Sequence, residues 1–130
     1  MGDLAGNRAL VCGGTHGIGA AAAEALHNRG AAVTILARSA TGTSALTCDL
    51  EDLEALTTPI KAELDANGAF EVLVNNSAGP PAGPLLEAAP ADFEKALRRH
   101  LFASHTLVQL LLPGMRATNY GRIINIISTS

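Results

Sequence analysis

The sequence predicts an α/β fold in which helices cover both faces of a doubly wound parallel sheet, giving three layers. Two observations carry this prediction. Short, nearly continuous apolar runs alternate with segments of helical periodicity, as expected for parallel strands that are covered on both faces. The first apolar run also leads through a glycine-rich turn directly into the first helical segment, which makes a strand–turn–helix unit.

The composition fits one ordered domain over residues 1–130 and excludes several classes of function. The chain is 48% hydrophobic, and 130 residues are enough to bury a sizeable core. A net charge of −3 without a basic run argues against nucleic acid as a partner. The apolar run 107–112 is too short to span a membrane, and Asp3 and Arg8 interrupt any signal peptide. We therefore expect a cytoplasmic protein.

The two cysteines, Cys12 and Cys48, each come at the end of an expected strand. Two cysteines make neither a disulfide framework nor a metal-binding quartet, so we expect no metal site. We interpret both residues as small apolar members of the core.

The glycine-rich turn spans residues 12–19 and reads C-G-G-T-H-G-I-G. It joins an expected strand at 8–12 to an expected helix at 17–28. Glycines permit a tight bend and the close approach of a ligand, and the start of a helix attracts anions. The turn thus predicts a pyrophosphate site, the alternative being a tight connection without a ligand. The candidate residues are Gly13, Thr15, His16, Gly17, Ile18 and Gly19.

The helix at 17–28 carries apolar residues at helical spacing and stops at Gly30. We expect Ile18, Ala22, Ala25 and Leu26 to form its buried face.

Arg38 directly follows the second expected strand, residues 32–37. In a dinucleotide-binding fold this strand end meets the adenosine ribose, where an acid binds the 2′-hydroxyl and an arginine pairs with a 2′-phosphate. Arg38 therefore favours NADP(H) over NAD(H), and His16 is a candidate second donor to the same phosphate. The alternative is that Arg38 is a solvated loop charge.

Only residues 39–43 separate the second strand from the third, expected at 44–48. Parallel neighbours normally need a crossover of a dozen or more residues. We therefore expect either a bare loop or a short, poorly paired third strand.

Asp49 comes after the third strand and is a candidate N-cap for a helix at 51–66. Apolar residues recur at helical spacing in this segment, and Pro59 predicts a kink or a restart near Thr58. The expected buried positions are Leu53, Leu56, Ile60 and Leu64.

The fourth expected strand, residues 70–75, ends in Asn75 and Asn76 and is followed by small residues and a proline-rich loop at 80–84. Adjacent asparagines are also found in ordinary turns. A helix is expected at 90–112 and a fifth strand at 121–128, with Ser128 the first polar residue after its apolar run.

Together these motifs resemble the short-chain dehydrogenase/reductase family. The family reads T-G-x-x-x-G-[IL]-G in the glycine turn, D-[VL] where Asp49 and Leu50 stand, N-N-A-G where this chain has N-N-S-A-G at 75–79, and G-x-I-[VI]-N-[IV]-S-S where it has G-R-I-I-N-I-I-S. The resemblance implies a Rossmann-type sheet of order 3-2-1-4-5. It also implies an NADP(H)-dependent oxidoreductase that transfers hydride between nicotinamide and a carbonyl or alcohol substrate.

The resemblance implies a role for each matching residue. Asp49 would bind the adenine amine and Leu50 would pack beside the ring. Asn75 would tie neighbouring strands together, and Ser128 would orient the substrate carbonyl, with its neighbours Thr129 and Ser130 as substitutes if the alignment is shifted. The residues expected to line the cofactor after the fourth strand are Asn76, Ser77 and Ala78.

Two departures from the family concern its catalytic residues. His100 stands where the family has the asparagine of its catalytic tetrad, which makes it the candidate to hold the proton-relay water, the alternative being a structural histidine on a packed helix. The family's Y-x-x-x-K segment is absent from these residues, because Tyr120 is the only tyrosine and has no lysine four residues later. We therefore expect the chain to be the N-terminal part of a reductase, with little activity by itself.

Three interpretations of function stay open at this point. The first is the reductase. The second is a non-catalytic dinucleotide-binding module or truncated paralogue, and the third is a scaffold that binds no nucleotide. The resemblance also implies homo-oligomers formed through the helix at 90–112, whose apolar positions suit either a symmetry mate or the core. These positions are Phe93, Leu97, Leu101, His105 and Val108.

Overall fold

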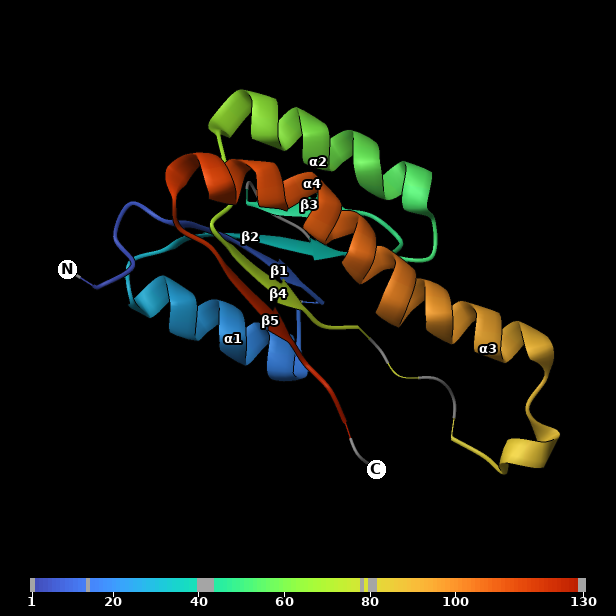
Figure 1. Cartoon of the computed structure of the whole chain (residues 1–130). Coiled ribbons are helices and arrows are strands. Elements are labelled where there is room, and N and C mark those ends of the chain that lie inside the picture. The colour runs from blue at the N-terminus through green and yellow to red at the C-terminus, as the bar shows by residue number, and fades with distance from the viewer. Residues whose placement is uncertain (1, 14, 40–43, 78, 80–81, 129–130) are drawn as a thin grey trace.

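A computed structural model of the chain describes residues 2–13, 15–39, 44–77, 79 and 82–128 (Figure 1). Within these residues, parallel strands form one sheet in the order β3-β2-β1-β4-β5, which confirms the predicted fold class and strand order. The strands are β1 (Arg8–Cys12), β2 (Ala32–Ala37), β3 (Ala45–Thr47), β4 (Val72–Asn75) and β5 (Arg122–Asn125).

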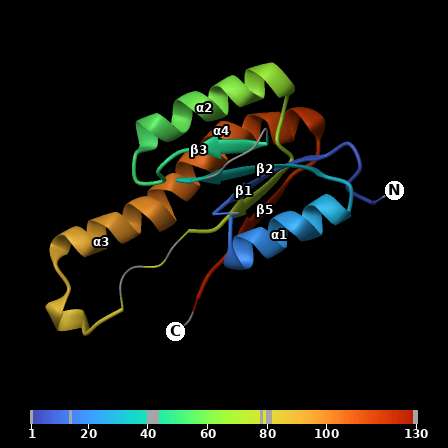
Figure 2. The ribbon, with the colours of Figure 1, turned by 180° about the vertical axis from the view of Figure 1, so that it is seen from behind.

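The helices complete the expected three layers. Helix α1 (Gly17–Asn28) lies on one face of the sheet, and α2 (Leu53–Asn67) and α4 (Ala103–Thr118) lie beside each other on the opposite face (Figures 1 and 2). The short η1 (Leu85–Glu87) and helix α3 (Pro90–Leu97) project beyond the sheet. None of the described helices is long and apolar enough to cross a bilayer.

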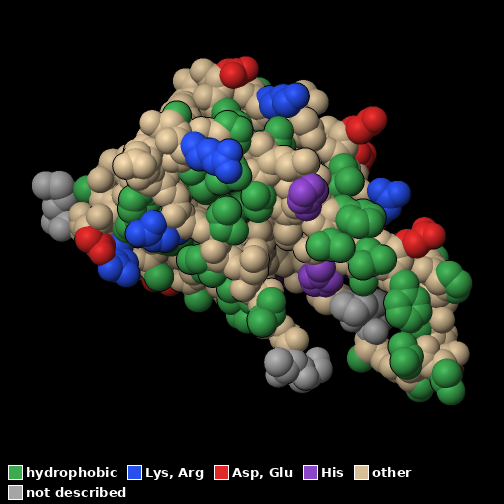
Figure 3. Space-filling model, in the orientation of Figure 1, with side chains coloured by type: hydrophobic (Ala, Val, Ile, Leu, Met, Phe, Trp, Pro, Cys, Tyr) green, Lys and Arg blue, Asp and Glu red, His purple; other side chains and the backbone are tan. Residues whose placement is uncertain are grey.

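The helix expected at 90–112 is interrupted by a π-helical segment, η2 (Arg98–Phe102), which joins α3 to α4. Three of the expected apolar positions, Phe93, Leu97 and Leu101, are 50%, 48% and 56% accessible, in the part of the chain that projects beyond the sheet. Val108, in α4, packs against the core. Figure 3 shows hydrophobic side chains gathered over the projecting arm formed by η1 and α3.

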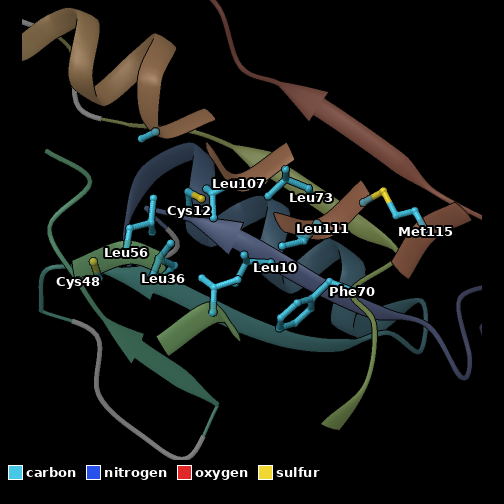
Figure 4. Packing of buried hydrophobic residues seen from close by; sticks show 12 residues of the cluster. Leu10, Cys12, Leu36, Cys48, Leu56, Phe70, Leu73, Leu107, Leu111 and Met115 are labelled. Atoms are coloured by element: carbon cyan, nitrogen blue, oxygen red, sulfur yellow. The ribbon is translucent and has the colours of Figure 1, made fainter. Parts of the chain in front are cut away.

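The core has two halves because successive residues of a strand face opposite sides of the sheet. Leu10 and Cys12 of β1 pack under α2 and α4 (Figure 4), whereas Ala9 and Val11 pack toward α1. Cys48 is also buried, which confirms both cysteines as core residues. The helix side of the larger half comes from Leu56, Ile60, Ala103, Leu107, Leu111 and Met115.

The predicted faces of the helices are partly right. In α2, Leu56 and Ile60 are fully buried, as expected. In α1 the buried residues are Gly19 and Ala23. Of the predicted face, Ala22 and Leu26 are partly buried against the core, whereas Ile18, at 61%, and Ala25 are exposed, so these two predictions were wrong. The smallest residues of α1 lie against the sheet because the helix packs close to it.

Pro59 lies inside α2, so of the two alternatives expected near Thr58, a kink or a restart, the restart was wrong. A proline removes one helical hydrogen bond and favours a break. Here Leu56 and Ile60, on either side of the proline, are both buried in the core. Their packing holds the helix together across the proline.

Helix α4 likewise runs through Pro113 and Gly114 to Thr118, so the end expected at residue 112 was wrong. Leu111 and Met115 anchor the helix in the core on both sides of this proline. The last turn ends at Asn119, whose φ of 55° is the left-handed conformation common after a helix.

The N-cap of α2 is Asp52 rather than Asp49. The Asp52 carboxylate accepts a 3.0 Å hydrogen bond from the amide of Ala55. Asp49 instead accepts a 2.9 Å hydrogen bond from the amide of Glu51, which forms a turn before the helix. The helix therefore starts two residues later than predicted, and Asp49 stays in the loop that follows β3.

Several strands are shorter than expected. β4 begins at Val72, and β5 ends at Asn125, so Ser128 lies beyond the strand rather than within it. β3 is short but pairs with β2 in parallel register from Ile35 opposite Ala45 onward. The crossover between β2 and β3 has no helix in its described part, and its residues 40–43 lie outside the described residues.

Candidate functional site

Two adjoining cavities open at the carboxyl ends of the strands. The smaller, of about 270 Å³, lies beside the ends of β1, β2 and β3. The larger, of about 1260 Å³, lies between the ends of β1, β4 and β5 and the start of α4. In open parallel sheets this edge, where the strand order reverses, is where ligands bind. The residues that line both cavities are Leu50, Asn76, Ser77 and Arg99.

The glycine turn brings the start of α1 to the smaller cavity. Gly13 and Gly17 have φ of 63° and 61°, a left-handed conformation that favours glycine. A Cβ on Gly19 would lie 2.1 Å from the carbonyl oxygen of Gly13, so this glycine permits the helix to pack against the turn. A Cβ on Gly17 would meet no described atom within 4 Å, which leaves open space over the first turn of α1.

The start of α1 has unused hydrogen-bonding capacity. Its N-cap is His16, whose side chain makes no capping hydrogen bond among the described residues. Backbone N–H groups at a helix start, together with the helix dipole, attract an anion. Asn76 stabilises the beginning of the turn, because its side-chain amide donates a 3.4 Å hydrogen bond to the carbonyl of Cys12.

The smaller cavity brings together residues from four separate motifs of the sequence. They come from the glycine turn, the end of β2, the segment after β3 and the end of β4. Arg38 and His16 are exposed at this cavity, so their donors are accessible to a ligand. The predicted site residues in its lining are Gly13, Thr15, His16, Arg38, Asp49, Leu50, Asn76 and Ser77.

The larger cavity holds Ile18, His100 and Ser128, with Asn76 and Ser77 on the side shared with the smaller one. The hydroxyl of Ser77 lies 2.7 Å from Nδ1 of His100, so the two side chains are hydrogen-bonded. The structure therefore places both predicted catalytic residues in one cavity. Ala78 and the substitutes Thr129 and Ser130 lie outside the described residues, and the predicted Gly17 and Gly19 line neither cavity.

Asn75 ties β4 to the edge strand β5, as the family resemblance implied. Its side-chain amide donates a 2.9 Å hydrogen bond to the side-chain oxygen of Asn125 on β5, and Asn75 is buried. A buried amide that lost this partner would cost about 1–3 kcal/mol. Asn125 also lines the larger cavity, and sequence analysis missed it. A polar residue inside the apolar run 123–127 was the signal for it.

Sequence analysis also missed Glu51 and Arg99. Arg99 Nε lies 2.7 Å from Glu51 Oε1, and Arg99 lines both cavities. Neither residue belongs to a sequence motif. Their contact depends on how η2 lies against the turn before α2, which no local pattern predicts.

Burial raises the pKa of the Cys12 thiol to about 12 and also raises the pKa of Cys48. Both thiols are therefore protonated at neutral pH, and neither acts as a nucleophile at the edge of the cavities. Among the described residues, no group of three or more histidine, cysteine or acidic side chains is placed to hold a metal ion.

A sequence model of short chain dehydrogenases matches residues 7–130 of this chain. The chain belongs to the short-chain dehydrogenase family. It is 31% identical to 2,3-dihydroxy-2,3-dihydro-p-cumate dehydrogenase of Pseudomonas putida, over 95% of this chain and 53% of that protein. It is also 31% identical to 3-oxoacyl-[acyl-carrier-protein] reductase FabG of Vibrio harveyi, over 95% of this chain and 55% of that protein.

Solved structures of short-chain dehydrogenases share the fold. A metagenomic short-chain oxidoreductase in complex with NADP has a TM-score of 0.88 at 33% identity, covering 98% of this chain and 64% of that one. L-sorbose reductase from Gluconobacter frateurii, complexed with NADPH and L-sorbose, has a TM-score of 0.83 at 26% identity, covering 93% and 52%. The chain thus spans about half the length of the short-chain dehydrogenases that it matches by sequence.

Proposed function

We propose that residues 1–130 form the NADP(H)-binding, N-terminal part of a short-chain dehydrogenase domain that interconverts a carbonyl and an alcohol. The observation that carries the proposal is the smaller cavity. There, the glycine turn, Arg38 and the Asp49–Leu50 pair meet around one space. Two related structures hold NADP or NADPH, which supports the same cofactor here.

The residues of the two cavities fit a dinucleotide phosphate. The open space over Gly17, at the start of α1, suits the pyrophosphate. Arg38 supplies a planar, permanently charged donor for the 2′-phosphate, and His16 supplies a second donor. Asp49 is the acceptor for the adenine amine. Asn76 lies at the passage toward the larger cavity, where the nicotinamide ribose would lie.

The larger cavity is the proposed place of the reaction. The bound cofactor supplies or accepts hydride. The Ser128 hydroxyl would donate a hydrogen bond to the substrate carbonyl and orient it. Nδ1 of His100 is engaged by Ser77, so Nε2 is the ring atom that would hold the relay water. The substrates named for the relatives differ, and we propose only the class of small carbonyl or alcohol compounds for this chain.

Two further parts of the proposal concern the setting of the protein. We place it in the cytoplasm, where NADPH-dependent reductases find their reductant. The exposed apolar stripe of Phe93, Leu97 and Leu101 is the surface that we propose for homo-oligomers.

The first test is a fluorescence titration of the purified chain with NADPH and with NADH. The proposal expects saturable binding of NADPH that is stronger than that of NADH. Equal affinity would overturn the assignment of NADP(H), and no binding of either cofactor would leave the scaffold interpretation.

A second candidate is the non-catalytic dinucleotide-binding module, which His100 in the asparagine position favours. Incubation with 4-deuterated NADPH and a panel of ketones and aldehydes tests one side of this choice, because deuterium in an alcohol product would overturn the module. Binding without transfer fits both candidates, since little activity is expected of residues 1–130 by themselves. The intact mass of the native protein then separates them: a mass well above 13.3 kDa supports the reductase, and a mass of 13.3 kDa supports the module.

A further inference from the structure

Arg99 and Glu51 form an ion pair beside the candidate site. Arg99 belongs to η2, between α3 and α4, and Glu51 belongs to the turn before α2. Nε of Arg99 lies 2.7 Å from Oε1 of Glu51, and the two side chains are 24% and 23% exposed. The pair is more buried than a surface ion pair, so the position of the guanidinium is well defined.

The ion pair stands at the junction of the two cavities. Of the four described residues that line both of them, Arg99 is the only charged one. Glu51 follows Asp49 and Leu50 in the chain, which line the smaller cavity. The pair therefore holds the guanidinium next to the segment proposed to bind adenine.

The chemistry of the pair selects a flat, neutral ligand group. Because the carboxylate of Glu51 balances the charge of the Arg99 guanidinium, the guanidinium attracts a phosphate less strongly. The planar face of a guanidinium still stacks well on an aromatic ring, and such contacts are strongest where water is excluded. In a dinucleotide that extends through both cavities, the aromatic ring beside Asp49 and Leu50 would be the adenine.

We infer that Arg99 is a specificity-determining residue of the nucleotide site, stacking its guanidinium on the adenine ring beside Leu50, with Glu51 as the positioning residue. This inference rests on the proposed NADP(H) function. It adds a side chain from the π-helical segment, which no motif of the sequence marks as part of the nucleotide site. The competing explanation is that the ion pair only ties α4 to α2.

The experiment compares two halves of the cofactor on the full 130-residue chain. The probes are 2′,5′-ADP, which contains adenine, and reduced nicotinamide mononucleotide, which does not. The test variant is Arg99→Leu, and the matched control is Arg98→Leu. Arg98 is the preceding arginine, is exposed and lines neither cavity, and its loss changes the net charge equally.

We expect Arg99→Leu to weaken binding of NADPH and of 2′,5′-ADP by roughly 5- to 30-fold, the range typical of a desolvated stacked cation. Binding of reduced nicotinamide mononucleotide should be unchanged, and Arg98→Leu should resemble wild type with all three ligands. Arg99→Lys keeps the charge but not the plane, so it should restore thermal stability without restoring affinity for 2′,5′-ADP. Glu51→Gln should weaken 2′,5′-ADP more modestly, because the guanidinium loses its anchor.

Arg99→Leu leaves the partly buried carboxylate of Glu51 without its partner, which can impair folding. The double variant Glu51→Gln/Arg99→Leu removes this carboxylate and is the variant to use if Arg99→Leu folds poorly. Unchanged affinity for 2′,5′-ADP in a folded Arg99 variant would overturn the inference and leave only the structural tie. Equal losses with both probes, or in Arg98→Leu, would overturn it too. If wild type binds neither NADPH nor 2′,5′-ADP, the proposed function itself fails; if wild type binds and the variants match it, only this inference fails.

Discussion

The hydroxyl oxygen of Ser77 lies 2.7 Å from Nδ1 of His100, and this hydrogen bond joins the end of β4 to the π-helical segment η2. The two residues are 23 positions apart in the chain and belong to different predicted motifs. Their contact orients the imidazole ring and determines which ring nitrogen faces the larger cavity. The catalytic part of the proposal depends on this orientation.

Substitution of Ser77 by alanine should release the imidazole of His100. We expect the Nδ1 resonance of His100 in ¹⁵N NMR spectra to move toward that of an unbonded imidazole nitrogen, because the hydroxyl partner is lost. His105 lines the same cavity and is the internal control, whose resonances should stay in place. An unchanged His100 spectrum would contradict the hydrogen bond.

Gly17→Ala should reduce cofactor binding, with Gly68→Ala as its control. Both glycines have positive φ, 61° and 88°, and at both a Cβ would meet no described atom within 4 Å. Each substitution should lower the free energy of unfolding by about 1–3 kcal/mol, measured by urea denaturation. Only the methyl group at residue 17 enters the proposed pyrophosphate space, so only Gly17→Ala should weaken NADPH binding, by roughly 10-fold or more. Equal NADPH affinities in the two variants would contradict this placement.

Arg38→Ala should reduce the preference for NADPH. Hydrogen bonds between an arginine and a phosphate contribute about 1.5–3 kcal/mol, so NADPH affinity should fall roughly 10- to 100-fold while NADH affinity stays the same. Isothermal titration calorimetry with both cofactors measures the effect. Arg116→Ala removes an exposed arginine of α4 that lines neither of the two cavities, and it should bind like wild type. A parallel loss of NADH affinity in Arg38→Ala would place the arginine elsewhere on the cofactor.

Cys12 should make the stability of the protein fall at alkaline pH. Burial raises the pKa of its thiol from the ordinary 9.0 to about 12, so above pH 9 the unfolded chain loses a proton that the folded protein keeps. The stabilising contribution is complete below pH 9 and is lost between pH 9 and 12, at about 1.4 kcal/mol per pH unit. Urea unfolding at several pH values should show a shallower decline in Cys12→Ala than in wild type. The same slope in both proteins would show that the thiol does not stay protonated in the folded state.

Most of the fold and many of the candidate site residues were predictable because their signals are local. The apolar runs that form β1 and β2 and the glycine turn between β1 and α1 are short segments whose conformation depends on their own residues. Since parallel strands end at one edge of the sheet, the motifs after β1, β2, β3 and β4 had to meet there.

The incorrect predictions came from positions where distant contacts outweigh local preference. Pro59 and Pro113 favour helix ends, but buried neighbours on both sides keep α2 and α4 continuous. Asp49 and Asp52 are both acceptable N-caps, and only the actual start of α2 distinguishes them.

The sequence by itself determined the fold class and the set of motifs that surround the smaller cavity, because periodicity and glycine spacing act over a few neighbouring residues. The strand order followed from the resemblance of these motifs to a known family. Only the tertiary structure decided which residues the side chains of η2 contact. A π-helical turn inserted between α3 and α4 places Arg99 against Glu51 and His100 against Ser77. These partners are separated by 23 or more positions in the chain, and only the packing of α4 over the sheet brings them within hydrogen-bonding distance.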